Sequence, residues 1–92
     1  MASEPALLVD FWGTWCGPCR ALRPHLERLA EEHAAKWRMV AVNVDQEPEA
    51  AQRYDVMGTP TLLLFRGGEL KRRLSGSPQL GVVACELESV DV

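Results

Sequence analysis

The chain has 92 residues, 47% hydrophobic and 25% charged, which is the balance of one globular domain and excludes a disordered or fibrous protein. Ten Lys and Arg residues against thirteen Asp and Glu residues give a net charge of −3, so charge favours neither a nucleic-acid nor a membrane partner. Apolar runs are too short to span a bilayer and no secretory signal is recognisable, so we expect a single cytoplasmic domain over 1–92 with 1–5 as a loose leader.

The apolar pattern alternates between strand and helix along the chain. The first two strands are joined through a helix and should be parallel, whereas a turn at Gly67-Gly68 should make the last two antiparallel. The order β-α-β-α-β-β-α predicts an α/β fold, a mixed four-stranded sheet with helices on both faces. The predicted elements are strands at 7–12, 38–44, 61–65 and 69–74 (the first two buried on both faces) and helices at about 18–35, 47–54 and 78–88.

Two positions in the first predicted helix stand out. Pro24 lies inside it, where proline removes a backbone donor and should kink the axis. Arg23 falls on its polar side, so we expect that side chain to face solvent.

Cys16-Gly17-Pro18-Cys19 stands at the start of that helix, with the two cysteines close enough to bond to each other. Unpaired backbone N–H groups there should stabilise a thiolate at Cys16 and lower its pKa. Cys19 lies one turn further and should be more buried, so we expect it to stay a thiol. Cys16 would attack a target disulfide and Cys19 would then release the product, while Gly17 and Pro18 keep the turn tight and Cys16 accessible.

Asp10 is an acid inside the apolar strand 7–12, where burial should raise its pKa. It lies six residues before Cys16, and it could take the Cys19 proton through a water and return it. The alternative is a structural acid with a local backbone or lysine partner.

Thr59-Pro60 precedes the third strand, and X–Pro bonds are the usual site of cis peptides. A cis Pro60 beside Cys16 would offer backbone groups to an extended substrate segment, whereas the alternative is an ordinary trans turn. Trp15 directly precedes the nucleophile, and we interpret it as a partner-contact residue rather than a core residue.

These segments resemble the thioredoxin family in order and spacing, over roughly residues 6–80. The resemblance implies the thioredoxin fold and a thiol–disulfide oxidoreductase that reduces protein disulfides. It implies a nucleophile at Cys16, a resolving thiol at Cys19, a buried acid at Asp10 and a cis proline at Pro60. The matching segments are Val9-Asp10-Phe11-Trp12, Trp15-Cys16-Gly17-Pro18-Cys19, Pro24, Asn43-Val44-Asp45 and Gly58-Thr59-Pro60-Thr61-Leu62.

The same resemblance implies further roles and partners. Trp12 and Trp15 would flank the disulfide, and Gly76 would lie on the substrate-binding surface. Electrons would come from thioredoxin reductase drawing on NADPH, with no cofactor bound by the chain itself. The Gly-Pro dipeptide between the cysteines is that of the reducing members, which favours a reductant over an oxidant or isomerase.

Departures from the family pattern lead to separate expectations. We expect the family's usual first strand and helix to be missing here. Their absence would leave an uncovered apolar edge, so we expect a monomer or a weak dimer through residues 39–44. Ala41 stands where the family usually has a lysine near the buried acid, so we expect the pKa of Asp10 to lie even higher. The loop after Gly76 is short, which leaves the place of the last helix open.

The alternative from a different class of function is a binding module without catalysis. A thioredoxin-like binding module would hold a partner through Trp15, Pro60 and Gly76 without turnover, although such a scaffold needs neither the cysteine pair nor Asp10. We interpret Cys85 as a small buried hydrophobe, and we expect no metal site, since zinc would need four ligands and no second close-spaced pair exists.

Overall fold

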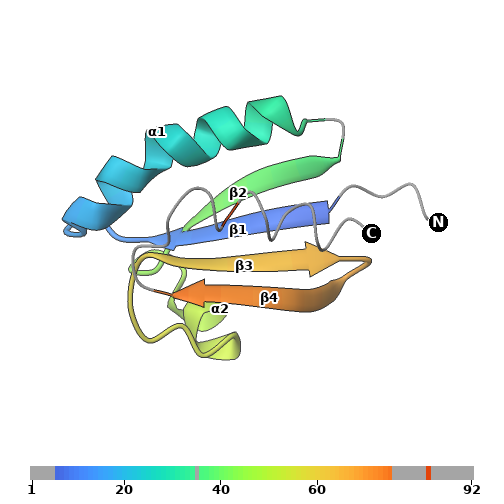
Figure 1. Ribbon diagram of the computed structural model, residues 1–92. Helices are drawn as coiled ribbons and strands as arrows, with labels where there is room; N and C mark the ends of the chain where they lie inside the picture. The colour runs from blue at the N-terminus through green and yellow to red at the C-terminus, as the bar shows by residue number, and fades with distance from the viewer. Residues whose placement is uncertain (1–5, 35, 76–82, 84–92) are drawn as a thin grey trace.

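The computed structural model describes residues 6–34, 36–75 and 83 (Figure 1). Every predicted element up to the fourth strand is confirmed, with small differences at the ends; the predicted helix at 78–88, Gly76 and Cys85 lie outside the described residues. Within the described ranges, no helix has both the length and the hydrophobicity needed to cross a bilayer. The elements are β1 (Ala6–Trp12), α1 (Gly17–Glu32), β2 (Trp37–Asn43), α2 (Pro48–Arg53), β3 (Thr61–Arg66) and β4 (Glu69–Ser75).

The four strands form one mixed sheet in the order β2-β1-β3-β4. β1 runs parallel to β2 and antiparallel to β3, and β3 and β4 form the predicted antiparallel hairpin. Gly67 (φ 62°) and Gly68 (φ 79°) make its turn in the left-handed region, which glycine adopts at little cost. The predicted α/β topology is confirmed for these elements.

Alternation along β1 directs side chains into two separate cores, one on each face of the sheet. Leu8 packs in the core that contains Leu22 and Leu26 of α1. Phe11 packs in the other core, which contains Ala51 of α2. The two helices therefore cover opposite faces, as Figure 1 shows with α1 above the sheet and α2 below it.

β2 departs from the prediction of a strand buried on both faces. Val40 is 44% exposed, Ala41 is exposed, and only the end residues Trp37 and Asn43 are buried. The apolar run was misleading because β2 lies at the edge of the sheet, where a strand has one neighbour instead of two. Among the described residues β2 is an edge strand with Val40 exposed, in agreement with the expectation of an apolar edge.

Candidate redox site

Cys16 and Cys19 form a disulfide at the start of α1, with their Cα atoms 5.3 Å apart. Cys16 is the N-cap, with an extended backbone (φ −94°, ψ 102°), and Pro18 occupies the first turn, where its missing N–H leaves no bond unmade. The backbone N–H of Cys19 donates to Cys16 Sγ at 3.1 Å. The predicted placement of Cys16 at the helix start is confirmed, and a helix N–H points at its sulfur.

The burial of the two sulfurs differs from the prediction. Cys16 is 3% exposed and Cys19 is 2% exposed, so in the disulfide form Cys16 is not on an open edge and Cys19 is not distinctly more buried. The reason is the N-cap geometry, in which the Cys16 side chain folds back over the first turn to reach the Cys19 N–H. The two sulfurs therefore differ in hydrogen bonding rather than in burial, while their neighbours Gly17 and Pro18 are exposed.

Trp15 is 62% exposed yet held in place. Its indole Nε1 donates to Asp45 Oδ2 at 2.8 Å, and Asp45 in turn donates its backbone N–H to Asn43 Oδ1 at 2.8 Å. Gly13 lies directly beneath the ring, since a Cβ atom built there would lie 2.7 Å from the indole. An exposed aromatic with a fixed orientation suits contact with a partner. Sequence reasoning assigned no role to Asp45 or Gly13, and the motif Asn43-Val44-Asp45 was the only signal for Asp45.

Asp10 is 1% exposed, and in the described part of the chain neither of its carboxylate oxygens has a hydrogen-bond donor. Its strand neighbours in register are Ala41 and Leu62, which carry no charge. Burial raises the pKa of Asp10, and the charge of Arg23 acts in the opposite direction with the smaller effect. The predicted direction is confirmed.

Ala41 leaves no cation at the β2 position beside Asp10, as expected, but a cation that the sequence pattern did not predict reaches the carboxyl from α1. Arg23 Nε lies 3.4 Å from Asp10 Oδ2, an ion pair that falls short of a well-directed hydrogen bond. Arg23 was expected to face solvent, but its side chain is only 29% exposed because it turns inward from α1 toward β1. The cation therefore comes from the helix, although the β2 position beside Asp10 holds Ala41.

Arg23 also contacts the aromatic ring of Trp12. Its guanidinium carbon lies 4.6 Å from the ring centroid. Both residues border a small cavity of about 160 Å³, together with Cys19, Arg20 and Pro24. Trp12 and Pro24, which were singled out by resemblance, thus lie at the same cavity as the second cysteine.

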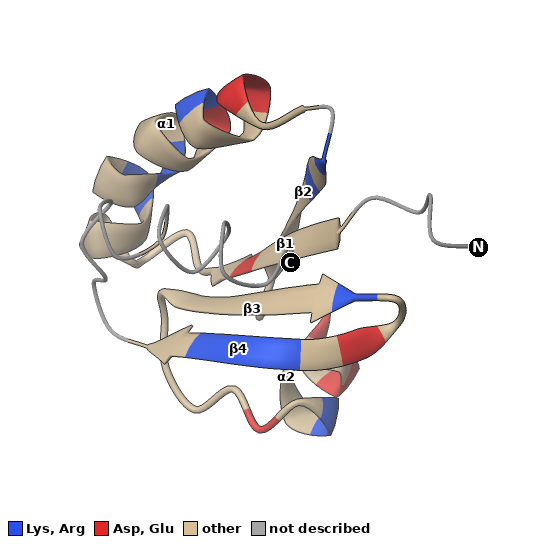
Figure 2. Cartoon of the chain, turned by 45° about the vertical axis from the view of Figure 1, so that its right-hand side comes forward, with Lys and Arg blue, Asp and Glu red and all other residues tan. Residues whose placement is uncertain are grey.

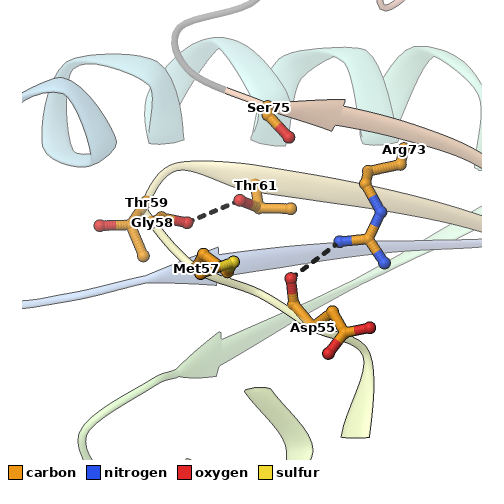
Figure 3. Close-up of a pocket in the computed structure, with 7 residues that line it drawn as sticks. All are labelled: Asp55, Met57, Gly58, Thr59, Thr61, Arg73 and Ser75. Carbon is orange, nitrogen blue, oxygen red and sulfur yellow. Dashed lines mark hydrogen bonds between the residues drawn. The ribbon is translucent and has the colours of Figure 1, made fainter. Parts of the chain in front are cut away.

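The Thr59–Pro60 peptide is cis, as predicted, and Pro60 is buried. The Thr61 hydroxyl donates to the Gly58 carbonyl at 2.6 Å, which holds the turn that precedes β3. Figure 3 shows Gly58, Thr59 and Thr61 lining one side of an open pocket of about 500 Å³, with Arg73 of β4 across from them. Arg73 donates to the backbone carbonyl of Asp55 at 3.4 Å, so this hydrogen bond links β4 to the segment that follows α2.

Among the described residues, β4 carries a run of basic side chains. Figure 2 shows the basic run of β4, whose side chains are exposed, and Lys71 Nζ pairs with Glu69 at 2.6 Å. In the residues that the structure describes, no group of three His, Cys, Asp or Glu side chains could hold a metal ion.

Known proteins support the chemistry that this geometry indicates. The family model Thioredoxin matches residues 1–88. The chain belongs to the thioredoxin family. Among its relatives, Thioredoxin 1 of Chlorobaculum tepidum is 48% identical over 75 residues (82% of this chain, 74% of the relative). The thioredoxin of Alicyclobacillus acidocaldarius is 49% identical over 73 residues (79% of this chain, 70% of the relative).

Solved structures agree with the sequence relatives. A mutant thioredoxin from Halobacterium salinarum matches with a TM-score of 0.88 at 34% identity, covering 96% of this chain and 76% of that one. Mitochondrial thioredoxin 3 from Saccharomyces cerevisiae in its oxidized form matches with a TM-score of 0.86 at 30% identity, covering 96% and 81%. The thioredoxin fold is confirmed, and this family member is a thiol–disulfide oxidoreductase that reduces protein disulfides.

Proposed function

We propose that reduction starts with attack by the Cys16 thiolate on a substrate disulfide. Cys16 Sγ forms a bond to one substrate sulfur, and the other substrate sulfur leaves as a thiolate that takes up a proton. The observation that carries this assignment is the Cys19 N–H donated to Cys16 Sγ at 3.1 Å, at the N-terminus of a 16-residue helix. In the reduced form, that donor and the helix dipole stabilise negative charge on this sulfur.

Cys19 then resolves the mixed disulfide. Its thiol gives its proton to the Asp10 carboxylate through a water, and its sulfur attacks Cys16 Sγ, so that the Cys16–Cys19 disulfide forms and the second substrate sulfur leaves as a thiolate. The substrate gains two electrons and the dithiol loses two. Asp10 suits the part of base because it is buried without a hydrogen-bond donor in the described residues, so its carboxylate is free to accept a proton.

The substrate-contact surface proposed here surrounds the cysteine pair. Trp15 supports it, being exposed and yet oriented by Asp45. An extended segment of the substrate would pair with the backbone at Thr59 and Pro60. The remaining members are Gly17 and Pro18, which are exposed beside the disulfide, and Gly76, which lies outside the described residues.

We also propose an electron donor and a compartment for this dithiol chemistry. The chain carries no recognisable nucleotide-binding loop, so we infer that a thioredoxin reductase drawing on NADPH returns the disulfide to the dithiol. A reducing dithiol is productive in a reducing compartment, which supports the cytoplasm as the site of action. Re-reduction of the oxidised chain by a purified bacterial thioredoxin reductase, followed as NADPH consumption, tests this assignment; no consumption above the enzyme alone would reject it.

Turnover separates the proposed mechanism from the alternative of a binding module. In insulin reduction with dithiothreitol, the unaltered chain should accelerate precipitation, and Cys16→Ser should abolish the acceleration. Cys19→Ser should lose turnover while retaining a mixed disulfide that mass spectrometry detects. Cys85→Ser is the matched control and should behave as the unaltered chain. Equal rates for the unaltered chain and Cys19→Ser would favour the binding module.

Self-association through residues 39–44 is a separate proposal. Val40 and Val42 of the edge strand β2 border an apolar groove of about 530 Å³ on the α2 face of the sheet. A second copy could pair with the free edge, giving a weak dimer in exchange with the monomer. Light scattering at rising concentration should show a mass that increases for the unaltered chain and stays monomeric for Val40→Lys. Leu70→Lys, at an exposed apolar position of β4, is the control; a monomer at all concentrations would reject the dimer.

A further inference from the structure

We propose that Arg23 is a positioning residue for the release step, because its guanidinium, which contacts both the Trp12 ring and the Asp10 carboxylate, favours the charged form of Asp10 that accepts the Cys19 proton. This inference rests on the proposed role of Asp10 as the base. It concerns a residue that the sequence pattern placed in solvent.

The two members of the ion pair differ in their exposure to water. Asp10 is almost completely buried, whereas Arg23 keeps nearly a third of its side chain exposed. An arginine can bury its stem and part of its guanidinium at modest cost because the group is weakly hydrated. The chain can therefore bring a positive charge to within 3.4 Å of the carboxylate without burying a second ion fully.

Trp12 fixes where that charge lies. The guanidinium carbon is 4.6 Å from the indole centroid, within the range of a cation–π contact. A planar guanidinium can stack on the ring and pair with the carboxylate together, whereas the ammonium of lysine has no flat face to stack. Charge and stacking together therefore favour arginine at this position.

Helical spacing brings the same side chain to the reacting cysteine. Arg23 follows Cys19 by four residues in α1, so the two residues lie on one face of the helix. Both border the cavity of about 160 Å³, as does Trp12 at the end of β1. Arg23 therefore contacts the Asp10 carboxylate and also borders the cavity that Cys19 lines.

Other described residues around Asp10 are neutral or exposed. The β2 and β3 residues in register with Asp10 are Ala41 and Leu62, which are neutral. Arg20 borders the same cavity but is exposed. Within the described residues, Arg23 is the charged group that acts on the Asp10 carboxyl.

Titration of the Asp10 carboxyl by carbon NMR in the oxidised protein tests the pairing without depending on turnover. The cysteines do not titrate in the disulfide, so they do not obscure the signal. We expect Arg23→Gln to move the Asp10 midpoint to higher pH and Arg23→Lys to move it less. Arg28→Gln, the same change at an exposed position of α1, should leave it in place. An unmoved midpoint in Arg23→Gln would overturn the proposal.

The pH profile of insulin reduction tests the consequence for release. Arg23→Gln should lose roughly threefold more of its rate at the acidic end of the profile than at the alkaline end, because fewer Asp10 carboxylates are charged at lower pH. In an Asp10→Asn background the same change should add no pH-dependent loss. A loss that persists there would mean that Arg23 acts on Cys19 directly, which overturns the proposal. If Asp10→Asn alone left the profile unchanged, the base role of Asp10 would fail while the NMR result still reported the pairing.

Discussion

At the scale of single residues, two opposing effects act on the pKa of the Asp10 carboxyl. Burial disfavours its charge, because no donor in the described residues replaces the lost water. Arg23 favours the charge, but a partly exposed guanidinium is screened by solvent and does not compensate fully. Desolvation is the larger effect, so the pKa of Asp10 lies above its ordinary value of 3.8.

This balance predicts a pH dependence of folding stability. Because the pKa of Asp10 is higher in the folded chain than in the unfolded chain, the folded state binds more protons between the two values. The stabilising contribution is complete below the unfolded pKa near 3.8 and is lost as the pH rises through the folded pKa. One such group gives a slope of at most about 1.4 kcal/mol per pH unit.

Urea unfolding of the oxidised chain across this pH range measures that contribution. The difference in unfolding free energy between Asp10→Asn and the unaltered chain should grow as the pH rises and then level off. All other carboxyl groups are common to both proteins, so their titration cancels in the difference. A difference that is independent of pH would show that the pKa of Asp10 is not raised by folding.

A second prediction at this scale concerns the glycine beneath Trp15. Gly13→Ala would place a Cβ atom 2.7 Å from the indole, so the ring must move and its 2.8 Å hydrogen bond to Asp45 should break. We expect a shifted indole N–H resonance in the NMR spectrum and a stability loss of about 1 kcal/mol for the lost bond. Gly58→Ala is the control, because a Cβ atom there meets nothing within 4 Å. An unshifted resonance in Gly13→Ala would contradict the close packing.

At the scale of the elements, α1 organises the site, and its sequence made it predictable. The proline in the first turn and the spacing of Leu22 and Leu26 define its start and its buried face without reference to the rest of the chain. The motif at its N-terminus therefore predicted the place of both cysteines. The direction of Arg23 was not predictable, because a residue at the border of the helix's polar side can face water or a carboxylate on a neighbouring strand.

β2 shows the opposite case. Its apolar run was typical of a central parallel strand, yet the strand is at the sheet edge, and neighbours in a sheet are set by tertiary pairing rather than by the local sequence. The Trp15–Asp45 hydrogen bond was likewise not predictable from the local sequence, since it joins residues 30 apart in the chain. The sequence pattern predicted elements and the cysteine chemistry, whereas contacts between elements had to come from the structure.

A core substitution tests how far α1 depends on its buried face. Leu26 is fully buried in the core between α1 and the sheet. Leu26→Ala should lower the free energy of unfolding by about 2–5 kcal/mol, from lost burial and the cavity left behind. Leu70→Ala, at an exposed position, should change it by less than about 0.5 kcal/mol. Urea unfolding followed by circular dichroism measures both, and equal effects would mean that Leu26 is not a core residue in solution.

For the whole molecule, the redox state and the fold are thermodynamically linked. The Cys16–Cys19 bond joins the loop before α1 to the first turn of the helix, and α1 packs on the sheet through one of the two cores. A crosslink stabilises the folded state mainly by restricting the unfolded chain, even when the loop is short. Each reduction of a substrate, which oxidises the dithiol, should therefore leave the chain in its more stable form.

Chain-entropy arguments put the size of this effect at about 2 kcal/mol for the four-residue loop that the disulfide closes. Urea unfolding with and without dithiothreitol should show the reduced chain less stable by that amount. A Cys16→Ser, Cys19→Ser double variant should give superimposable curves under both conditions, which controls for effects of the reductant on the rest of the chain, Cys85 included. Superimposable curves for the unaltered chain would mean that contacts of the folded dithiol replace the stability that the disulfide provides. The free energy of unfolding would then not distinguish the two redox states.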